Sequence, residues 1–166
     1  ANEQGAWDVG CLPARLPGYG HVSDDAARQA IGTAWGCTLP AQPGLDLRSA
    51  LDAASAGRVK AMMVIGDHAN FTNGKLGDGI TALDTLEFLV VHDTFMSPAA
   101  ERADVVLPRV TFAEKDGTFT NLERRVQRLK PALQSPAAEA RPESWLICEL
   151  ARRMNATGFH YHSAEE

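Results

Sequence analysis

Two pairs of adjacent polar residues have the types and positions that chemistry requires: Asp67 with His68, and His92 with Asp93. Each pair directly follows an apolar run of the kind that forms a strand. Carboxylates and imidazoles bind ligands and transfer protons, and the carboxyl ends of adjacent parallel strands meet at one edge of a sheet. We therefore expect the four side chains to converge on a ligand. The alternative, in which the aspartates cap turns and the histidines lie at the surface, stays open.

Other kinds of chemistry are poorly supported. Neither His68 nor His92 has a partner in HxxxH, HxH or HExxH spacing, so the sequence does not favour a metal site at these residues. The three cysteines form no CxxC pair, which argues against a zinc or iron–sulfur motif; they are Cys11, Cys37 and Cys148. A GxSxG elbow is absent, and the glycine-rich piece Gly74–Gly79 lacks the GK[ST] of a phosphate loop. No residue is identified as catalytic.

The elements that position the two pairs follow from the pattern of apolar residues. The run Val59–Ile65 is typical of a fully buried strand in a parallel sheet, and its polar exit begins at Gly66. Phe88–Val91 and Val105–Leu107 predict two more strands. Residues suited to begin or end helices lie before and between these runs; they are Ser23, Asp24, Gly36, Asp46 and Ser97. The alternation predicts an α/β fold, doubly wound, with a mostly parallel, Rossmann-like sheet.

The character of the chain changes after Pro108. Lys115–Asn121 (KDGTFTN) indicates a turn with threonines instead of another apolar strand. We therefore predict a boundary near Thr111, with an α/β domain at 1–111. Residues 112–166 then comprise a turn-rich segment, a connector rich in alanine and proline, and a final helix over Pro142–Met154.

Composition bounds the class of protein. The chain has 166 residues, 45% hydrophobic, and a formal net charge of -5, which suits a globular domain and argues against a nucleic-acid surface. The basic stretch Glu123–Lys130 is interpreted as a solvated or subunit-facing edge. Sparse cysteines fit a reducing, cytoplasmic compartment, and no apolar run has the length of a membrane helix. Because the first residue is not methionine, we expect a segment of a longer or processed chain.

Four collinear stretches closely resemble one family, the molybdopterin-dependent oxidoreductases. They are NEQGAWDVGCLPARLPGYGHVSD, WGCTLPAQPGL, FLVVHDTFMSPAAERADVVLP and, above all, FAEKDGTFTNLERRVQRLKPAL. Within that family the resemblance is to the formate dehydrogenase α subunit and to the large iron–sulfur subunit of NADH:quinone oxidoreductase. It implies an internal part of a longer subunit, with iron–sulfur clusters and the molybdenum ligand elsewhere in the parent chain.

The resemblance also implies a cofactor surface. It implies that residues 1–111 belong to a domain that holds the guanosine end of a molybdopterin guanine dinucleotide, and that the segment after it folds back toward a cluster-binding domain. By position, the dinucleotide contacts fall at the exits of the first two strands; they are Gly66, His68, Thr72, His92, Asp93 and Ser97. No metal ligand falls in the chain.

Two departures from the family pattern divide the interpretations. The usual Gly-Glu-Asn/Asp-Pro is here Gly66-Asp67-His68-Ala69, and the usual glutamine before Asp93 is His92. These departures favour a mainly scaffolding domain of an NADH:quinone oxidoreductase large subunit, without a pterin. The alternative is the guanosine-binding part of a formate dehydrogenase α subunit. The expected partners are other domains of the same subunit and other subunits of a respiratory or formate-oxidising complex, peripheral to the inner membrane, with neither nucleic acid nor direct membrane insertion.

Overall fold

The computed structural model describes residues 2–66, 77–164 and 166. Three residues of the predicted ligand edge, Asp67, His68 and Thr72, lie outside the described residues. The chain divides into two compact units, one of Ala1–Ser49 with Thr118–Arg128 and the other of Ala50–Gly117 with Leu129–Glu166. This division differs from the predicted boundary at residue 111, because a segment from the second half of the chain packs with the first residues.

The first unit contains α1 (Glu3–Asp8), the short 3-10 helix η1 (Pro17–Tyr19) and α2 (Asp25–Trp35). The predicted caps of α2 are confirmed. The carboxylate of Asp24 accepts hydrogen bonds from the backbone N–H groups of Ala26 and Ala27 at 2.9 and 3.3 Å, and Gly36 ends the helix in the left-handed conformation, with φ of 66°. Asp24 satisfies donors that the first turn leaves free.

A two-stranded sheet completes the first unit. Its strands are β4 (Gly117–Thr120) and β5 (Val126–Leu129), whose outermost residues belong to the second unit. Asn2 ties β4 to the chain start, because its side-chain amide donates to Thr118 O at 3.0 Å and its side-chain oxygen accepts from Thr120 N at 2.9 Å. Arg124 also pairs with Asp8 at 2.7 Å. Polar contacts across more than 100 positions thus hold this unit together.

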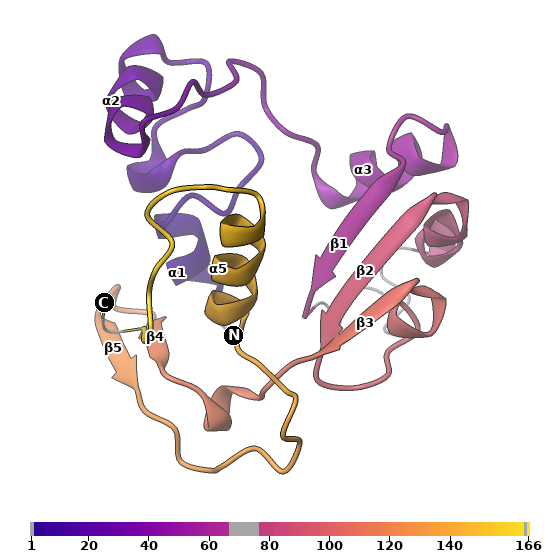
Figure 1. Cartoon of the computed structure of the whole chain (residues 1–166). Coiled ribbons are helices and arrows are strands. Elements are labelled where there is room, and N and C mark those ends of the chain that lie inside the picture. Colours follow the sequence, from indigo (N-terminus) through magenta and orange to yellow (C-terminus); the bar gives the residue numbers. More distant parts are fainter. Residues whose placement is uncertain (1, 67–76, 165) are drawn as a thin grey trace. The chain divides into compact units, whose positions relative to one another are not determined.

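The second unit is built on a parallel sheet with strand order β1-β2-β3 (Figure 1). The strands are β1 (Ala61–Ile65), β2 (Phe88–Asp93) and β3 (Val105–Pro108). Ile65 pairs with His92, and His92 with Leu107, so the three strands end at one edge. The helical elements are α3 (Leu47–Ser55), which crosses the unit boundary, η2 (Gly77–Thr85), η3 (Ala100–Arg102), η4 (Phe112–Glu114) and α5 (Glu143–Arg153). This confirms the predicted α/β class.

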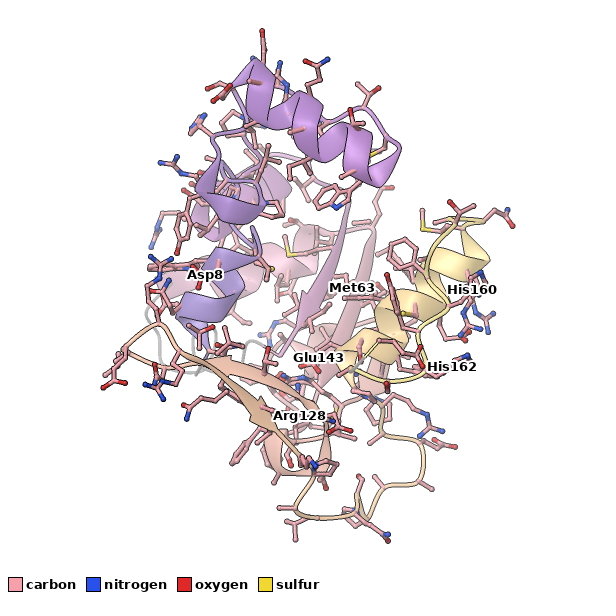
Figure 2. The ribbon with its side chains drawn as sticks, turned by 90° about the vertical axis from the view of Figure 1, so that its left-hand side faces the viewer. Asp8, Met63, Arg128, Glu143, His160 and His162 are labelled. Atoms are coloured by element: carbon pink, nitrogen blue, oxygen red, sulfur yellow. The ribbon has the colours of Figure 1, made fainter. Side chains whose placement is uncertain are left out.

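The two faces of the sheet differ in burial. Val64, Leu89 and Val91 lie on one face and are 8%, 1% and 0% exposed, in a core shared with residues of α3 and η2 such as Leu51 and Leu83. On the other face Met63 and Ile65 of β1 are both 39% exposed and Phe88 of β2 is 47% exposed (Met63 is labelled in Figure 2). The prediction of a fully buried first strand is therefore wrong, because β1 is an edge strand and the described residues leave one of its faces half exposed.

Candidate functional site

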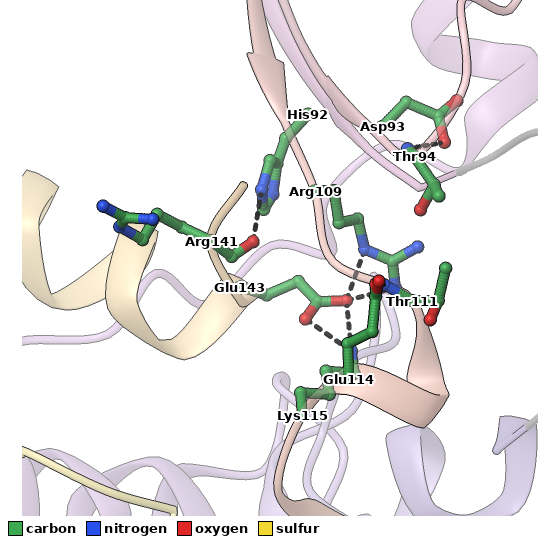
Figure 3. A network of polar contacts seen from close by, with 9 residues as sticks. All are labelled: His92, Asp93, Thr94, Arg109, Thr111, Glu114, Lys115, Arg141 and Glu143. Atoms are coloured by element: carbon green, nitrogen blue, oxygen red, sulfur yellow. Dashed lines mark hydrogen bonds and ion pairs between the residues drawn. The ribbon is translucent and has the colours of Figure 1, made fainter. Parts of the chain in front are cut away.

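The side chain of His92 is used inside the fold. Its imidazole is 1% exposed, and Nε2 lies 3.1 Å from the carbonyl oxygen of Arg141, which also accepts from Val110 N at 3.3 Å. Burial lowers the pKa of His92, and the hydrogen bond to Arg141 offsets this only in part. The neutral imidazole therefore carries its proton on Nε2 and holds the 141 segment against the sheet edge (Figure 3). The other nitrogen, Nδ1, is buried and makes no well-formed hydrogen bond with any described residue.

Asp93 points away from His92, as consecutive residues of a strand do. Its Oδ1 accepts a hydrogen bond from the backbone N–H of Thr94 at 2.7 Å (Figure 3), and its carbonyl oxygen accepts from Arg109 N at 3.0 Å. The structure therefore does not bring the imidazole of His92 and the carboxylate of Asp93 together. This geometry agrees with a turn-capping role for Asp93, which is the alternative that the sequence left open.

Ser97 begins the segment that contains η3. It is 2% exposed, and its hydroxyl oxygen accepts from Ala100 N at 3.3 Å. The hydroxyl satisfies the backbone donor of the first residue of η3, but η3 begins at Ala100 with Ala99 as its N-cap, later than the helix start predicted at Ser97. Like His92 and Asp93, Ser97 has a partner inside the fold.

Gly66 closes the exit of β1. Its N–H donates to the carbonyl oxygen of His92 at 2.9 Å, which continues the β1–β2 ladder by one bond. Its φ is +60°, a left-handed conformation that disfavours residues with a β-carbon. A β-carbon at Gly66 would also lie 2.6 Å from Nη1 of Arg109. The left-handed φ is the main constraint that favours glycine here, and a β-carbon would in addition require the guanidinium of Arg109 to shift.

Sequence reasoning missed an ion cluster around Glu143, the first residue of α5. Nε of Arg109 donates to Oε1 of Glu143 at 2.6 Å, and a second guanidinium nitrogen, Nη2, contacts the same oxygen. Nζ of Lys115 lies 2.7 Å from Oε1 and 2.5 Å from Oε2 (Figure 3). The partners are 34 and 28 positions from Glu143, so no local motif reveals them. The only signal is an acidic residue in a first helical turn.

The electrostatics of this cluster favour an ionised Glu143. Burial alone would raise the pKa of Glu143, but the hydrogen bonds from Lys115 and Arg109 outweigh it and lower the pKa to about 2. Two cations around one carboxylate leave a formal excess of one positive charge beside the carboxyl edge of the sheet.

A pocket of about 260 Å³ lies beside His92 on the α5 side of the sheet. Leu107, Pro108 and Leu146 supply apolar walls, and Glu139, Arg141 and Trp145 also line it. The guanidinium of Arg141 lies 5.6 Å from the ring centroid of Trp145, so that one face of the indole is already covered. The sequence did not predict this pocket.

A second feature missed in the sequence is the HxH pair His160 and His162, labelled in Figure 2. Both are exposed, and the backbone N–H of His162 donates to a carboxylate oxygen of Glu166 at 2.9 Å. Within residues 2–66, 77–164 and 166, no group of three or more histidine, cysteine or acidic side chains is placed to hold a metal ion.

The described part of the predicted edge does not fit the guanosine end of a pterin dinucleotide. His92, Asp93 and Ser97 each have a partner inside the fold, and His92 and Asp93 lie on opposite faces of the sheet. Nδ1 of His92 has no hydrogen-bond partner among the described residues, but the imidazole of His92 and the carboxylate of Asp93 diverge, so the two side chains do not face one guanine base together. The assignment of Gly66, His68, Thr72, His92, Asp93 and Ser97 to a cofactor stays a prediction.

Comparison with known proteins shows which family and which proteins the chain is similar to. A sequence model described as molybdopterin oxidoreductase matches residues 2–153. The chain is 43% identical over 164 residues to "Putative formate dehydrogenase YrhE" of Bacillus subtilis, covering 99% of this chain and 17% of that protein. It is 36% identical over 166 residues to "Formate dehydrogenase H" of Escherichia coli, covering 99% and 23%.

A further relative is named as a subunit of an NADH-quinone oxidoreductase. The chain is 37% identical over 141 residues to a subunit of the NADH-quinone oxidoreductase of Rhizobium meliloti, covering 85% of this chain and 16% of that protein. The solved structure of acetylene hydratase from Pelobacter acetylenicus matches with a TM-score of 0.61 and 24% identity, over 73% of this chain and 17% of that one; this likeness concerns the fold alone. The chain thus spans less than a quarter of each of these relatives. Within the described residues no helix has the length and apolar character to cross a membrane.

Proposed function

The chain belongs to the molybdopterin oxidoreductase family, and on that premise we propose that it is a mainly scaffolding segment of a large electron-transfer subunit of the NADH:quinone oxidoreductase type. In this proposal, iron–sulfur clusters elsewhere in the parent subunit carry the electrons. The family as a whole is one of molybdopterin proteins, and this segment supports a shared fold without contacting a pterin.

One observation carries the proposal: the polar side chains at the exit of β2 are occupied within the fold. His92 bonds to Arg141, Asp93 to Thr94, and Ser97 to Ala100. A ligand that bound at Nε2 of His92, Oδ1 of Asp93 or Oγ of Ser97 would have to replace contacts that hold the sheet edge, η3 and the start of α5, whereas Nδ1 of His92 has no hydrogen-bond partner among the described residues. A scaffold needs these internal contacts, whereas a nucleotide site needs free donors and acceptors.

The partners follow from the same proposal. The segment packs with other domains of its own subunit, and the subunit assembles with other subunits of a respiratory or formate-oxidising complex. That complex lies on the cytoplasmic side, peripheral to the inner membrane. The relative from Rhizobium meliloti is itself named as part of an NADH-quinone oxidoreductase, which supports a multi-subunit setting.

The second candidate is the guanosine-binding part of a formate dehydrogenase α subunit. It is favoured by the 43% identity to the putative formate dehydrogenase YrhE, which extends over 99% of this chain. In that case the guanosine end of a molybdopterin guanine dinucleotide would be held by the residues predicted from the resemblance, which are Gly66, His68, Thr72, His92, Asp93 and Ser97. The cofactor supplies the redox chemistry when bound, and the protein binds and orients it.

A GDP titration of the chain separates the two candidates. Thermal unfolding is followed by circular dichroism with GDP up to millimolar concentration, and with ADP as the matched control. The scaffolding proposal predicts no change in Tm with either nucleotide. A guanosine site with Kd near 10 μM would stabilise the fold by about 2.7 kcal/mol at 1 mM GDP. A rise in Tm with GDP and not with ADP would contradict the scaffolding proposal.

A further inference from the structure

Arg109 lies between Glu143 and Gly66, and the proposed function gives no reason for either neighbour. On one side, its Nε and Nη2 atoms hold Oε1 of Glu143. On the other, its guanidinium approaches Gly66 so closely that a β-carbon there would lie 2.6 Å from Nη1, 2.8 Å from Cζ and 3.3 Å from Nε. Three atoms of one planar group lie within 3.3 Å of that hypothetical β-carbon, so the guanidinium occupies the space that a side chain at Gly66 would take.

The conformation of Gly66 needs support. A φ of +60° is one of several that glycine adopts with similar ease, and glycine loses more conformational freedom on folding than any other residue. The N–H of Gly66 donates to His92 O at 2.9 Å. A rigid planar neighbour limits the alternatives open to the backbone.

Glu143 holds Arg109 in place, and Lys115 in turn holds Glu143. The side chains of Arg109, Lys115 and Glu143 are 25%, 19% and 22% exposed, so none of the three is free to move in solvent. The two contacts from Arg109 to one oxygen fix the plane of its guanidinium, as a Lys ammonium at that position could not. The orientation of the group is therefore set from α5, far along the sequence from β1.

We propose that Arg109 is a positioning residue for the exit of β1: Glu143 orients the guanidinium, and the guanidinium holds Gly66 in its left-handed turn. The start of α5 thereby controls the backbone geometry at the carboxyl end of the first strand. This inference is independent of which electron-transfer complex the chain serves. The alternative is that the cluster only anchors α5. In that case, amide hydrogen exchange at Gly66 would not depend on whether residue 109 carries a planar guanidinium.

Amide hydrogen exchange at Gly66 tests the proposal in the full chain. The variants are Arg109→Lys and Arg109→Met, with Arg102→Met as control, because Arg102 makes a comparable ion pair with Asp84 at 3.1 Å but precedes β3 at its opposite end. In Arg109→Lys we expect exchange at Gly66 to rise about tenfold while the other amides of β1 and β2 keep their rates. Arg102→Met should leave Gly66 unchanged.

Two results of the exchange experiment would overturn the proposal. If Arg109→Lys exchanges at Gly66 like the unmodified protein, the charge suffices and the proposal is overturned. If all sheet amides accelerate together, the effect is global unfolding, and that result also overturns a local positioning role.

A double-mutant cycle gives a second test that does not need exchange data. Gly66→Ala introduces a β-carbon that meets the Arg109 guanidinium, and Arg109→Ala removes that obstacle. We expect Gly66→Ala to lower Tm less in the Arg109→Ala background than in the unmodified one, because only the backbone strain remains there. Strictly additive shifts in Tm would show that the two residues do not act on each other.

Discussion

Two glutamates of α5 each bind two cations, and the difference between them shows what holds this fold. Glu143 binds Arg109 and Lys115, whereas Glu149 binds Arg152 and Arg153. The two carboxylates are almost equally exposed, at 22% and 23%, but the partners of Glu149 are 44% and 79% exposed and lie within one helical turn. The cluster around Glu143 joins segments that come together only on folding. The ion pairs of Glu149 stay within α5.

The largest expected effect is that of Glu143→Ala, which removes the carboxylate from between two largely buried cations. A pKa near 2 instead of 4.5 corresponds to at most about 3 kcal/mol of stabilisation. We expect the free energy of unfolding from urea denaturation to fall by about 2 to 3 kcal/mol, with the m-value unchanged. A loss below about 0.5 kcal/mol would place Glu143 in the same class as Glu149.

The same cluster predicts an acid dependence of stability. The pKa of Glu143 is lowered in the folded state, so its contribution is fully present above about pH 4.5 and is lost as the pH falls through about 2. Other carboxylates also titrate in this range, so the measured quantity is the difference in unfolding free energy between the unmodified protein and Glu143→Gln. We expect that difference to shrink steadily from pH 5 to pH 2. If the difference does not change with pH, the cluster does not lower the pKa of Glu143.

Glu149→Ala should have the smallest effect. Local i,i+3 and i,i+4 ion pairs with exposed arginines contribute about 0.3 to 0.5 kcal/mol each and are screened by salt. We expect a loss below about 1 kcal/mol that largely disappears in 0.5 M NaCl, with Glu143→Ala measured in parallel. A larger, salt-resistant loss would remove the distinction between the two glutamates.

Local signals made much of the fold predictable from the sequence. Asp24 and Gly36 mark the ends of α2 because capping is chemistry within a few residues. The final helix, predicted over Pro142–Met154 and found as Glu143–Arg153, follows from its apolar period. The three strand ends share one edge because parallel strands with short crossovers leave little alternative.

The parts that were missed depend on contacts between distant segments. The Glu143 cluster joins residues 28 and 34 positions apart, and Asn2 reaches β4 from 116 positions away. The exposure of Met63 depends on which elements cover each face of the sheet, which an apolar run does not reveal. The period of two along a strand separates His92 from Asp93, but the apolar run predicts a strand that ends at Val91 and so gives no sign of this separation.

Metal analysis of the full-length subunit that carries this chain tests the central claim most directly. The purified, folded subunit is analysed for molybdenum, tungsten and iron, and iron serves as the internal control for loading of its clusters. The scaffolding account predicts iron without molybdenum or tungsten. One molybdenum or tungsten per subunit would contradict it and would assign this segment to the cofactor domain of a formate dehydrogenase.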